Sequence, residues 1–346
     1  MGYNGPQQQM KKTLLFAVAM FVATFSFAQQ QLATLNHNDS ITVYYGATAL
    51  QQAHSAAVNG DIITLSPGAF QSVDITKAIT LRGAGMYPDT VAGTAPTTLI
   101  GDFTLTVEND SLHNLYLEGL ACANTMNYSK VYSPRFVKCL FRIISYTGSH
   151  TMRDAMFMNC IMENFCNLYN NNVASGGYAQ NTMFVNSVIL DLYRYGSPTL
   201  INCVAYFDPS ELNNGISVRN SILYFPNRNS NTNVYSVYNC IGIEYNNSPY
   251  NYFNSTGTQN HQILNYNSFA SVFKTFRGSI ADGVDFQLLD TIATSFLGTD
   301  GTQVGIYGGI MPFDPSVRNP LIKKCNVASR STADGKLAVD IEIVSE

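Results

Sequence analysis

The stretch Phe184-Val185-Asn186-Ser187-Val188 decides the fold, because close variants of it return along the middle of the chain. Each variant places one polar residue after two positions that are mostly apolar, and Cys or Ser follows it in all but the first copy. The polar residue of successive copies is Asn114, Lys138, Asn159, Asn186, Asn202, Asn220 and Asn239. Successive copies lie 16 to 27 residues apart. Repeats of this length are typical of solenoids, in which one coil stacks on the next.

The coils are predicted to be β rather than α. Each copy lies in a short apolar run rich in Val, Ile, Phe and Tyr, and no coil has room for two helices and a turn. Asn tolerates the left-handed backbone conformation that a tight bend between strands requires. Coils that stack about 4.8 Å apart bring their bend residues into register. We therefore expect the six Asn residues to form a structural ladder of hydrogen-bonded amides.

The seven cysteines fit stacked coils better than a disulfide framework. Cys139, Cys160, Cys203 and Cys240 each follow a bend position, where a small and weakly polar side chain suits a crowded inward corner. Stacked parallel neighbours also point the same way, which suits disulfide geometry poorly. We predict a buried stack of thiols, and the odd number leaves at least one cysteine free or paired between chains.

The N-terminal region has the pattern of a cap followed by the first coils. Residues 47–58 are predicted to form an amphipathic helix with Leu50, Ala53 and Ala57 on one stripe. Two short strands with turn residues follow, in 61–70 and in 78–85. With this order and the Asn repeat, the chain resembles the right-handed parallel β-helix proteins of the pectin-lyase-like superfamily. In that superfamily such a helix plugs the open end of the core.

The C-terminal part adds two further features. The glycine-rich segment 298–309 is similar to the closing segment of secreted β-helix proteins from Gram-negative bacteria. Beyond it, apolar and polar residues alternate in 337–344, which predicts a half-buried strand, and Leu321–Val327 is a possible partner. We therefore expect an all-β fold, with a right-handed parallel β-helix solenoid at residues 38–312, an N-terminal capping helix and, at 313–346, a C-terminal β-hairpin that caps the rod or docks on its side.

The first residues have the character of a secretory signal peptide. Lys11 and Lys12 precede the apolar run 13–27, and Ala28 ends a small-x-small site. We predict a signal peptide at residues 1–28, with Met10 as the natural start, although an uncleaved anchor is the alternative. No later stretch is apolar and long enough to cross a bilayer, so after cleavage we expect an exported protein that is periplasmic, on the cell surface or extracellular.

Composition excludes several classes of protein. Charged residues make up only 12% of the chain, against about 25% in typical domains. The 19 basic and 23 acidic residues leave a net charge of −4 and no basic stripe, which argues against a nucleic-acid partner. High hydrophobicity argues against disorder.

The search for catalytic chemistry yields one modest group. Motifs of pectate lyases and of galacturonan hydrolases are missing, and the five His residues lack metal-ligand spacing, so no metal site and no cofactor are predicted. Calcium is expected only if the protein is a lyase. Counted from the bends, Arg142, Glu163 and Asp191, with Arg194 close behind, would share one face. They could supply the base and the cation of a β-elimination, but a solvated row of surface ion pairs would look the same.

Binding a polysaccharide requires fewer precisely placed groups than cleaving one. Tyr193, Tyr195, Tyr206 and Tyr224 recur at comparable depths in successive coils, where their rings could stack on sugar rings beside Asn amides. Tyrosine is also simply a good residue for a half-buried strand, and the chain has no Trp.

Some exported proteins of one Gram-negative bacterial phylum are O-glycosylated at Asp-Ser or Asp-Thr followed by an apolar residue. The pattern occurs at Ser40, Thr90, Ser111 and Thr291. Whether these sites carry sugar is not determined by the sequence.

Three functions remain open. The leading expectation is an exported β-helix protein that binds a polysaccharide or a surface glycan without cleaving it. A polysaccharide lyase or glycoside hydrolase with a diverged site is the second, and a structural or adhesive surface protein is the third. Neither the identity of the glycan nor the oligomeric state follows from the sequence.

Overall fold

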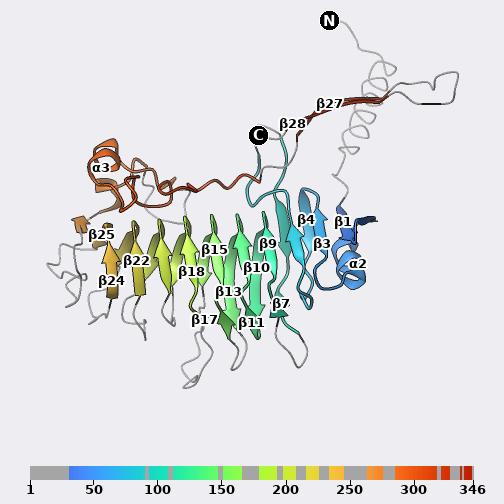
Figure 1. The fold of residues 1–346 in the computed structure, drawn as a ribbon, viewed down its shortest axis with the longest axis horizontal. Helices are drawn as coiled ribbons and strands as arrows, with labels where there is room; N and C mark the ends of the chain where they lie inside the picture. The colour runs from blue at the N-terminus through green and yellow to red at the C-terminus, as the bar shows by residue number, and fades with distance from the viewer. Residues whose placement is uncertain are drawn as a thin grey trace, which may run out of the picture.

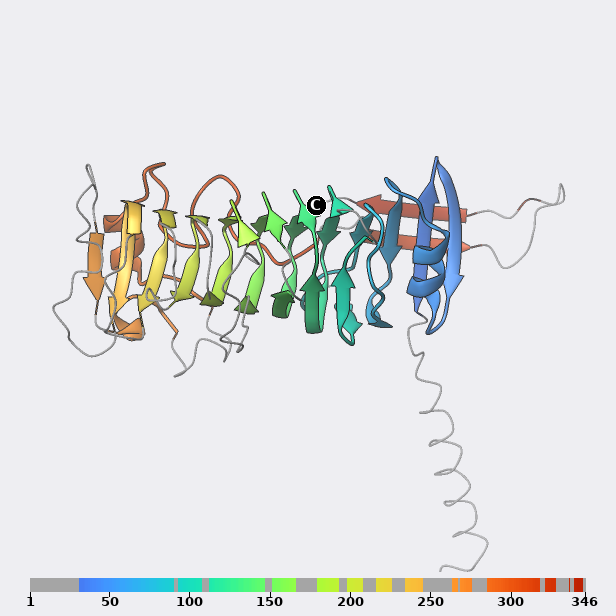
Figure 2. The ribbon, with the colours of Figure 1, turned by 90° about the horizontal axis from the view of Figure 1, so that it is seen from below.

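The computed structural model describes most of the chain beyond residue 30. The described ranges are 31–89, 93–107, 112–146, 151–165, 179–192, 198–207, 216–225, 234–244, 263–266, 268–275, 285–317, 321–327, 336 and 339–344. They form a long rod of stacked parallel coils (Figures 1 and 2). The predicted all-β class and the parallel β-helix are confirmed. The predicted signal peptide at 1–28 lies outside the described residues and stays a prediction.

Three sheets run along the rod. In spatial order, sheet A consists of β2 (Ser40–Tyr45), β1 (Leu32–His37), β3 (Ile62–Leu65), β5 (Thr80–Arg82), β9 (Tyr116–Glu118), β12 (Arg135–Val137), β15 (Met156–Met158), β18 (Met183–Val185), β20 (Thr199–Ile201), β22 (Ile216–Arg219) and β24 (Val234–Tyr238). Sheet B consists of β4 (Gly68–Gln71), β6 (Thr97–Ile100), β10 (Ala121–Tyr128), β13 (Leu140–Tyr146), β16 (Ile161–Phe165), β19 (Val188–Leu192), β21 (Val204–Phe207), β23 (Ile222–Phe225), β25 (Cys240–Glu244) and β26 (Ile263–Tyr266), with β7 (Phe103–Leu105) also paired to β10. Sheet C consists of β8 (Leu112–His113), β11 (Val131–Tyr132), β14 (Met152–Arg153) and β17 (Ala179–Gln180).

Bend residues with positive φ join sheet A to sheet B. We call these residues the A–B bend row, and they are Gly119, Lys138, Asn159, Asn186, Asn202, Asn220 and Asn239. The φ angles of its non-glycine members lie between 45° and 53°. The backbone N–H of each of the first six donates to a carbonyl of the next coil, as from Asn186 to Ile201 at 3.0 Å. The row therefore stacks in register along the rod.

Asn114 does not belong to this row, so its placement in the predicted ladder is wrong. It follows β8 of sheet C, and its N–H donates to the carbonyl of Tyr132, next to Ser133. Asn114 thus lies at the bend from sheet C to sheet A, together with Ser133, Asp154 and Asn181, which also have positive φ. The two bends share one backbone conformation, and this similarity misled the alignment of the repeat. Gly119 occupies the place that Asn114 was expected to fill.

The interior is built from side chains that repeat at the same position of each coil. Phe136, Phe157 and Phe184 lie on adjacent strands of sheet A and are fully buried. Their rings stack with centroid distances of 4.5 Å and 5.2 Å. Stacked rings in a dry core contribute both buried area and favourable ring geometry.

The residues that follow the A–B bends form a second buried stack. Its cysteines are Cys139, Cys160, Cys203 and Cys240, and all four are unpaired and fully buried. The thiol of Cys203 donates to the carbonyls of Phe184 and Ile201, each at 3.3 Å. Burial raises the pKa of Cys203 and Cys240 to about 12, so these thiols stay protonated and unreactive near neutral pH.

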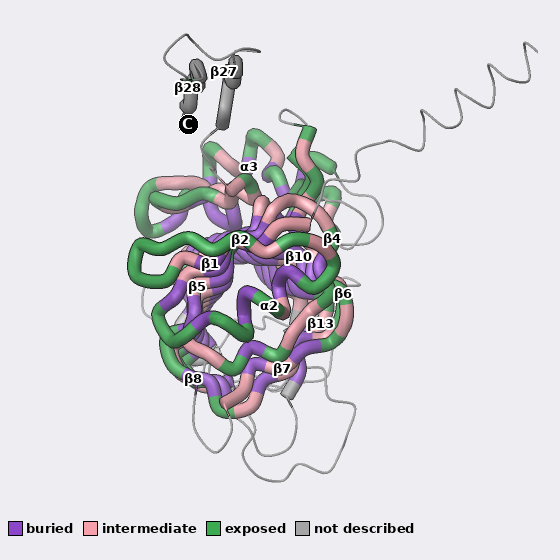
Figure 3. Tube along the Cα trace, turned by 90° about the vertical axis from the view of Figure 1, so that its right-hand side faces the viewer, coloured by how far each residue is buried: buried purple, intermediate pink, exposed green. Residues whose placement is uncertain are grey.

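The N-terminal end of the core is covered by α2 (Ala49–Ala56), which crosses the end of the rod (Figure 3). Leu50 and Ala53 of this helix, and Ala57 just after it, are buried. The antiparallel strands β1 and β2 extend sheet A beyond the first coil and contact the same helix. Helix and hairpin together shield the apolar edge that the first coil would otherwise expose.

A buried histidine makes this cap sensitive to acid. His54 accepts a hydrogen bond at Nε2 from the backbone N–H of Thr76. Burial, and then the charge of nearby Lys77, lower its pKa from 6.5, against a weaker opposite effect of Asp74. In the unfolded chain His54 is in contact with water and its pKa returns to its ordinary value. The unfolded chain therefore binds a proton at a higher pH than the folded chain.

We therefore expect the free energy of unfolding to fall as the pH drops from 6.5 toward the lowered pKa of His54. Melting temperatures measured from neutral pH down to about pH 5 test this, with His54→Gln as the control that removes the ionisable group. An equally steep loss of stability in His54→Gln would contradict the assignment to His54.

The C-terminal part does not add coils but folds back on the rod. Residues 268–275 and 285–296, which we call the C-terminal cover, contain η2 (Phe269–Ser271) and α3 (Asp290–Ser295) and cover part of the outer face of sheet B. The return strap, residues 297–317, then runs from α3 along the rod toward β27 (Figure 1). The predicted hairpin is present as β27 (Leu321–Val327) and β28 (Val339–Val344), paired antiparallel, and it stands apart from the rod.

The return strap lies on the A–B bend row. The side-chain amide of Asn239 donates to the carbonyl of Leu297 at 2.9 Å. Asn220 Oδ1 accepts from the N–H of Thr299 at 2.8 Å. Asn186 Nδ2 donates to two strap carbonyls, Ile306 and Gly308, at 2.8 Å and 2.7 Å. The expected chain of amide-to-amide bonds is thus replaced, at these three positions, by bonds from the row to the strap.

A glycine of the return strap and a lysine of the A–B bend row complete the contact between the two. A Cβ on Gly298 would lie 2.7 Å from the Asn220 side chain, so the strap can approach this closely only without one. Lys138, the single lysine of the row, reaches Asp314 of the strap at 3.3 Å and the carbonyl of Ser316. Burial raises the pKa of Asp314, but hydrogen bonds from Ser316 and the charge of Lys138 outweigh it and hold that pKa below its usual range.

Candidate functional site

The outer face of sheet B brings two of the sequence-predicted site residues together. Phe141 of β13 pairs with Met162 of β16, so Arg142 and Glu163 occupy adjacent outward positions one coil apart. Arg142 is exposed and Glu163 is half-buried. A cation and a carboxylate therefore stand next to each other on the surface of the rod.

Asp191 does not lie in line with this pair. Met162 pairs with Ile189 and Phe165 with Leu192, which places the backbone of Asp191 opposite Asn164 and Leu190 opposite Glu163. The backbone of Asp191 is thus one residue away from the row that contains Arg142 and Glu163. Arg194 lies outside the described residues. Of the predicted catalytic set, the structure thus places Arg142 and Glu163 side by side, with the backbone of Asp191 one residue out of register.

Tyr87 is a site residue that the sequence did not reveal. It lies in the loop after β5, and its ring is 44% exposed. Burial, and then the nearby carboxylate of Glu163, raise the pKa of Tyr87. The hydroxyl thus stays protonated near neutral pH and is a hydrogen-bond donor. No repeat or motif marks this residue, because a loop from an earlier coil carries it.

Two of the four predicted tyrosines lie next to each other on the same face, with their ring planes at 41°. Tyr206 and Tyr224 are register neighbours on β21 and β23, and their ring centroids are 4.9 Å apart. Tyr224 also contacts Phe269 of the C-terminal cover, with centroids 4.5 Å apart. Both tyrosines are half-buried. Tyr193 and Tyr195 lie outside the described residues.

We call Arg142, Glu163, Leu190, Tyr206 and Tyr224 the sheet B strip, because they occupy consecutive outward positions along the rod. Four strand spacings give it a length of about 19 Å. One end is charged, and the other end is apolar and aromatic. The apolar end continues into a buried cluster formed with residues of the C-terminal cover, such as Ile292 and Phe296.

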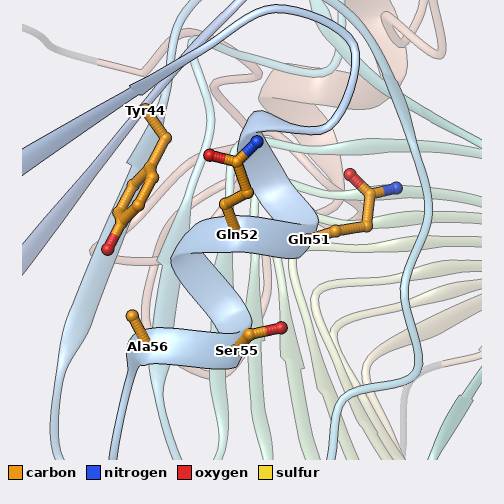
Figure 4. A pocket seen from close by; sticks show the side chains of 5 residues that line it. All are labelled: Tyr44, Gln51, Gln52, Ser55 and Ala56. Atoms are coloured by element: carbon orange, nitrogen blue, oxygen red, sulfur yellow. The ribbon is translucent and has the colours of Figure 1, made fainter.

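A shallow depression of about 520 Å³ lies at the N-terminal cap, away from the strip. Figure 4 shows Tyr44 of β2 opposite α2, which carries Gln51, Gln52 and Ser55. Gln51 Nε2 donates to the carbonyl of Gln71, and Gln52 Nε2 donates to Thr48 Oγ1. The lining of the depression is made of two side-chain amides, a hydroxyl, a phenol and a methyl group.

Two broader searches are negative for the described part of the chain. It contains no cluster of three or more His, Cys, Asp or Glu side chains that would suit a metal ion. Nor does any of its helices combine the length and the apolar character that crossing a bilayer demands. Of the possible O-glycosylation sites, Ser40 and Thr291 are exposed, whereas Thr90 and Ser111 lie outside the described residues.

Comparison with known proteins gives no relative from which a role could be carried over. The chain matches no protein-family model, no curated protein and no solved structure.

Proposed function

We propose that this protein is an exported β-helix protein that binds an extended polysaccharide or another surface glycan along the sheet B strip, without cleaving it. The observation that carries the proposal is the line of aromatic and charged side chains along the rod, with the neighbouring rings of Tyr206 and Tyr224 at one end and Arg142 and Glu163 adjacent at the other. We further propose that the fold is a diverged relative of the pectin-lyase-like superfamily, which its capping helix and Asn bends support.

The geometry suits a polymer better than a small molecule. The strip is a surface feature about 19 Å long rather than an enclosed cavity. The spacing of about 4.8 Å between strands is comparable to the length of one pyranose unit, so each coil can contact one sugar residue of the polymer. Aromatic faces can stack on the apolar faces of sugars, while Arg142 can bind a carboxylate or hydroxyl group.

The chemistry favours binding over cleavage. Of the predicted set Arg142 and Glu163 lie adjacent, and because a guanidinium stays protonated in proteins, this pair offers one carboxylate and no second group that can exchange a proton. The Tyr87 hydroxyl adds a hydrogen-bond donor and not a base, since its pKa is raised. Export is supported by the predicted signal peptide, and the protein recovered outside the cytoplasm is expected to begin at Gln29.

The test is affinity electrophoresis against a panel of acidic and neutral polysaccharides, with the same mixtures assayed for unsaturated products and for reducing ends. We expect retardation by one class of polysaccharide and no product of either kind. Arg142→Ala and Tyr206→Ala are expected to weaken binding at least about 10-fold, which corresponds to about 1.4 kcal/mol.

Arg153→Ala is the matched control, because Arg153 is an exposed arginine on sheet C that lies over the ring of Tyr132. It is expected to bind as the parent does. Unsaturated products would establish a lyase and reducing ends a hydrolase, and either result would overturn the non-catalytic proposal. No retardation by any polysaccharide would favour a structural role, and equal losses in Arg153→Ala and Arg142→Ala would remove the strip as the site.

A further inference from the structure

The outer face of sheet A carries an apolar patch that the core does not use. Strand alternation points one set of side chains of sheet A inward and the other outward. The outward apolar residues at the centre of the rod are the half-buried Met156, Met158, Met183, Val185 and Ile201, together with Val137, which is only 8% exposed. None of them belongs to either buried apolar cluster or packs against one. The return strap and the C-terminal cover lie on the bend row and on sheet B instead.

Charged and aromatic residues flank the patch at both ends of one outward row. We call this row the sheet A row, and in register along the rod it reads Arg82, Glu118, Val137, Met158, Val185, Ile201, Arg219 and Tyr238. Glu118 is held in place by Arg82, at 3.2 Å, and by a hydrogen bond with Tyr116. At the other end the exposed Arg219 lies over the ring of Tyr238, 5.6 Å from its centroid.

The order of residues in the sheet A row is complementary to its own reverse. A twofold axis parallel to the strands, placed between Met158 and Val185, brings the row of one copy against the reversed row of another. Glu118 then faces Arg219 of the second copy, and Arg82 faces the Tyr238 ring. In the centre Val137 meets Ile201, and Met158 meets Val185. Each of these four pairings occurs twice, once on either side of the twofold axis, as an isologous interface requires.

We propose that the protein forms an antiparallel twofold dimer, in which the outer faces of sheet A from two copies pack against each other. Apolar contacts at the centre supply the association energy, with methionine side chains adapting to the partner. The ion pairs and the cation–π contacts at the two ends set the direction and the register. The row spans about 34 Å and is narrow, so the interface is at the small end of the known range and the dimer is weak.

The first test is the mass in solution over a concentration series, by analytical ultracentrifugation. We expect a monomer–dimer equilibrium in the micromolar range and no species larger than a dimer, because a twofold interface closes on itself. Arg219→Glu places two like-charge pairs in the dimer and is expected to weaken it at least about 10-fold. Arg153→Glu is the matched control, since it makes the same charge change and loses the same kind of ring contact on sheet C, and its dimer is expected to be unchanged.

The decisive test mixes two variants that each fail alone. Glu118→Arg and Arg219→Glu are each expected to stay monomeric, because each homodimer would contain two like-charge pairs. In an equimolar mixture the two substituted side chains face each other at one end of the interface, and the native Glu118 and Arg219 face each other at the other end. The mixture is therefore expected to recover the dimer as a heterodimer, a result that a misfolded variant cannot produce. A melting curve for each variant checks that Glu118→Arg still folds beside Arg82.

The proposal would be overturned by a monomer at every concentration, or by equal weakening of the dimer by Arg153→Glu and Arg219→Glu. It would also be overturned by a mixture that stays monomeric although both variants fold. Growth into chains longer than a dimer would equally exclude a twofold interface.

Discussion

Replacing Phe157 by Ala is expected to lower the free energy of unfolding by about 3–5 kcal/mol. Phe157 is fully buried and its ring lies between the rings of Phe136 and Phe184, so truncation removes two ring contacts and leaves a cavity at the centre of the rod. The coils on either side are held by their own strand pairings, which limits how far the cavity can collapse. Urea denaturation measures the change.

Two control variants give the scale against which the Phe157→Ala result is judged. Phe157→Leu keeps most of the buried volume and is expected to cost about 1–2 kcal/mol. Ile100→Ala removes a large apolar side chain that is 45% exposed and is expected to cost less than about 1 kcal/mol. If Phe157→Ala were no more harmful than Ile100→Ala, the stacked interior described for sheet A would be wrong.

Replacing Asn186 by Asp is expected to cost about 2–4 kcal/mol and to release the return strap. The substitution keeps the shape of the side chain and tolerates positive φ. It exchanges Nδ2, which donates to the carbonyls of Ile306 and Gly308, for an oxygen that faces both of them. The new carboxylate would also be almost fully buried, since Asn186 is only 1% exposed.

The readout is hydrogen exchange of residues 297–317 together with urea denaturation. Faster exchange in the strap is expected at pH 7, with partial recovery in acid, where the new carboxyl binds a proton and can again donate. Asn114→Asp is the control, because Asn114 has a similar φ of 57° but is exposed at the other bend. Equal effects of the two substitutions would mean that the conformation of the bend, and not the strap, accounts for the loss.

The fold was predictable because its signals are local and repeated. Each bend needs a residue that accepts positive φ, each inward corner needs a small side chain, and each strand needs a buried apolar position. These demands recur in every coil, so Asn186 with Ser187 and Asn202 with Cys203 carry the same information several times. The error at Asn114 has the same origin, since two different bends of one coil make the same local demand.

The candidate site was less predictable, because its geometry depends on register. Arg142 and Glu163 lie side by side as their spacing from the bends suggested, whereas one extra residue before Asp191 moves that position out of line. Tyr87 approaches Glu163 from a loop of a much earlier coil. Tyr224 is partly covered by Phe269, a residue 45 positions further along the chain, so its aromatic face is shared between packing and any ligand.

The sequence by itself thus determined the stacked β coils, the bend conformation and the buried thiols, because the physical requirement for each is met within a few residues and repeats from coil to coil. Only the tertiary structure decided what the Asn side chains bind, which face of sheet B is covered and which outward row is self-complementary. These features join segments far apart in the chain, such as Asn186 and Gly308, which are 122 positions apart, so no local signal in the sequence marks that contact.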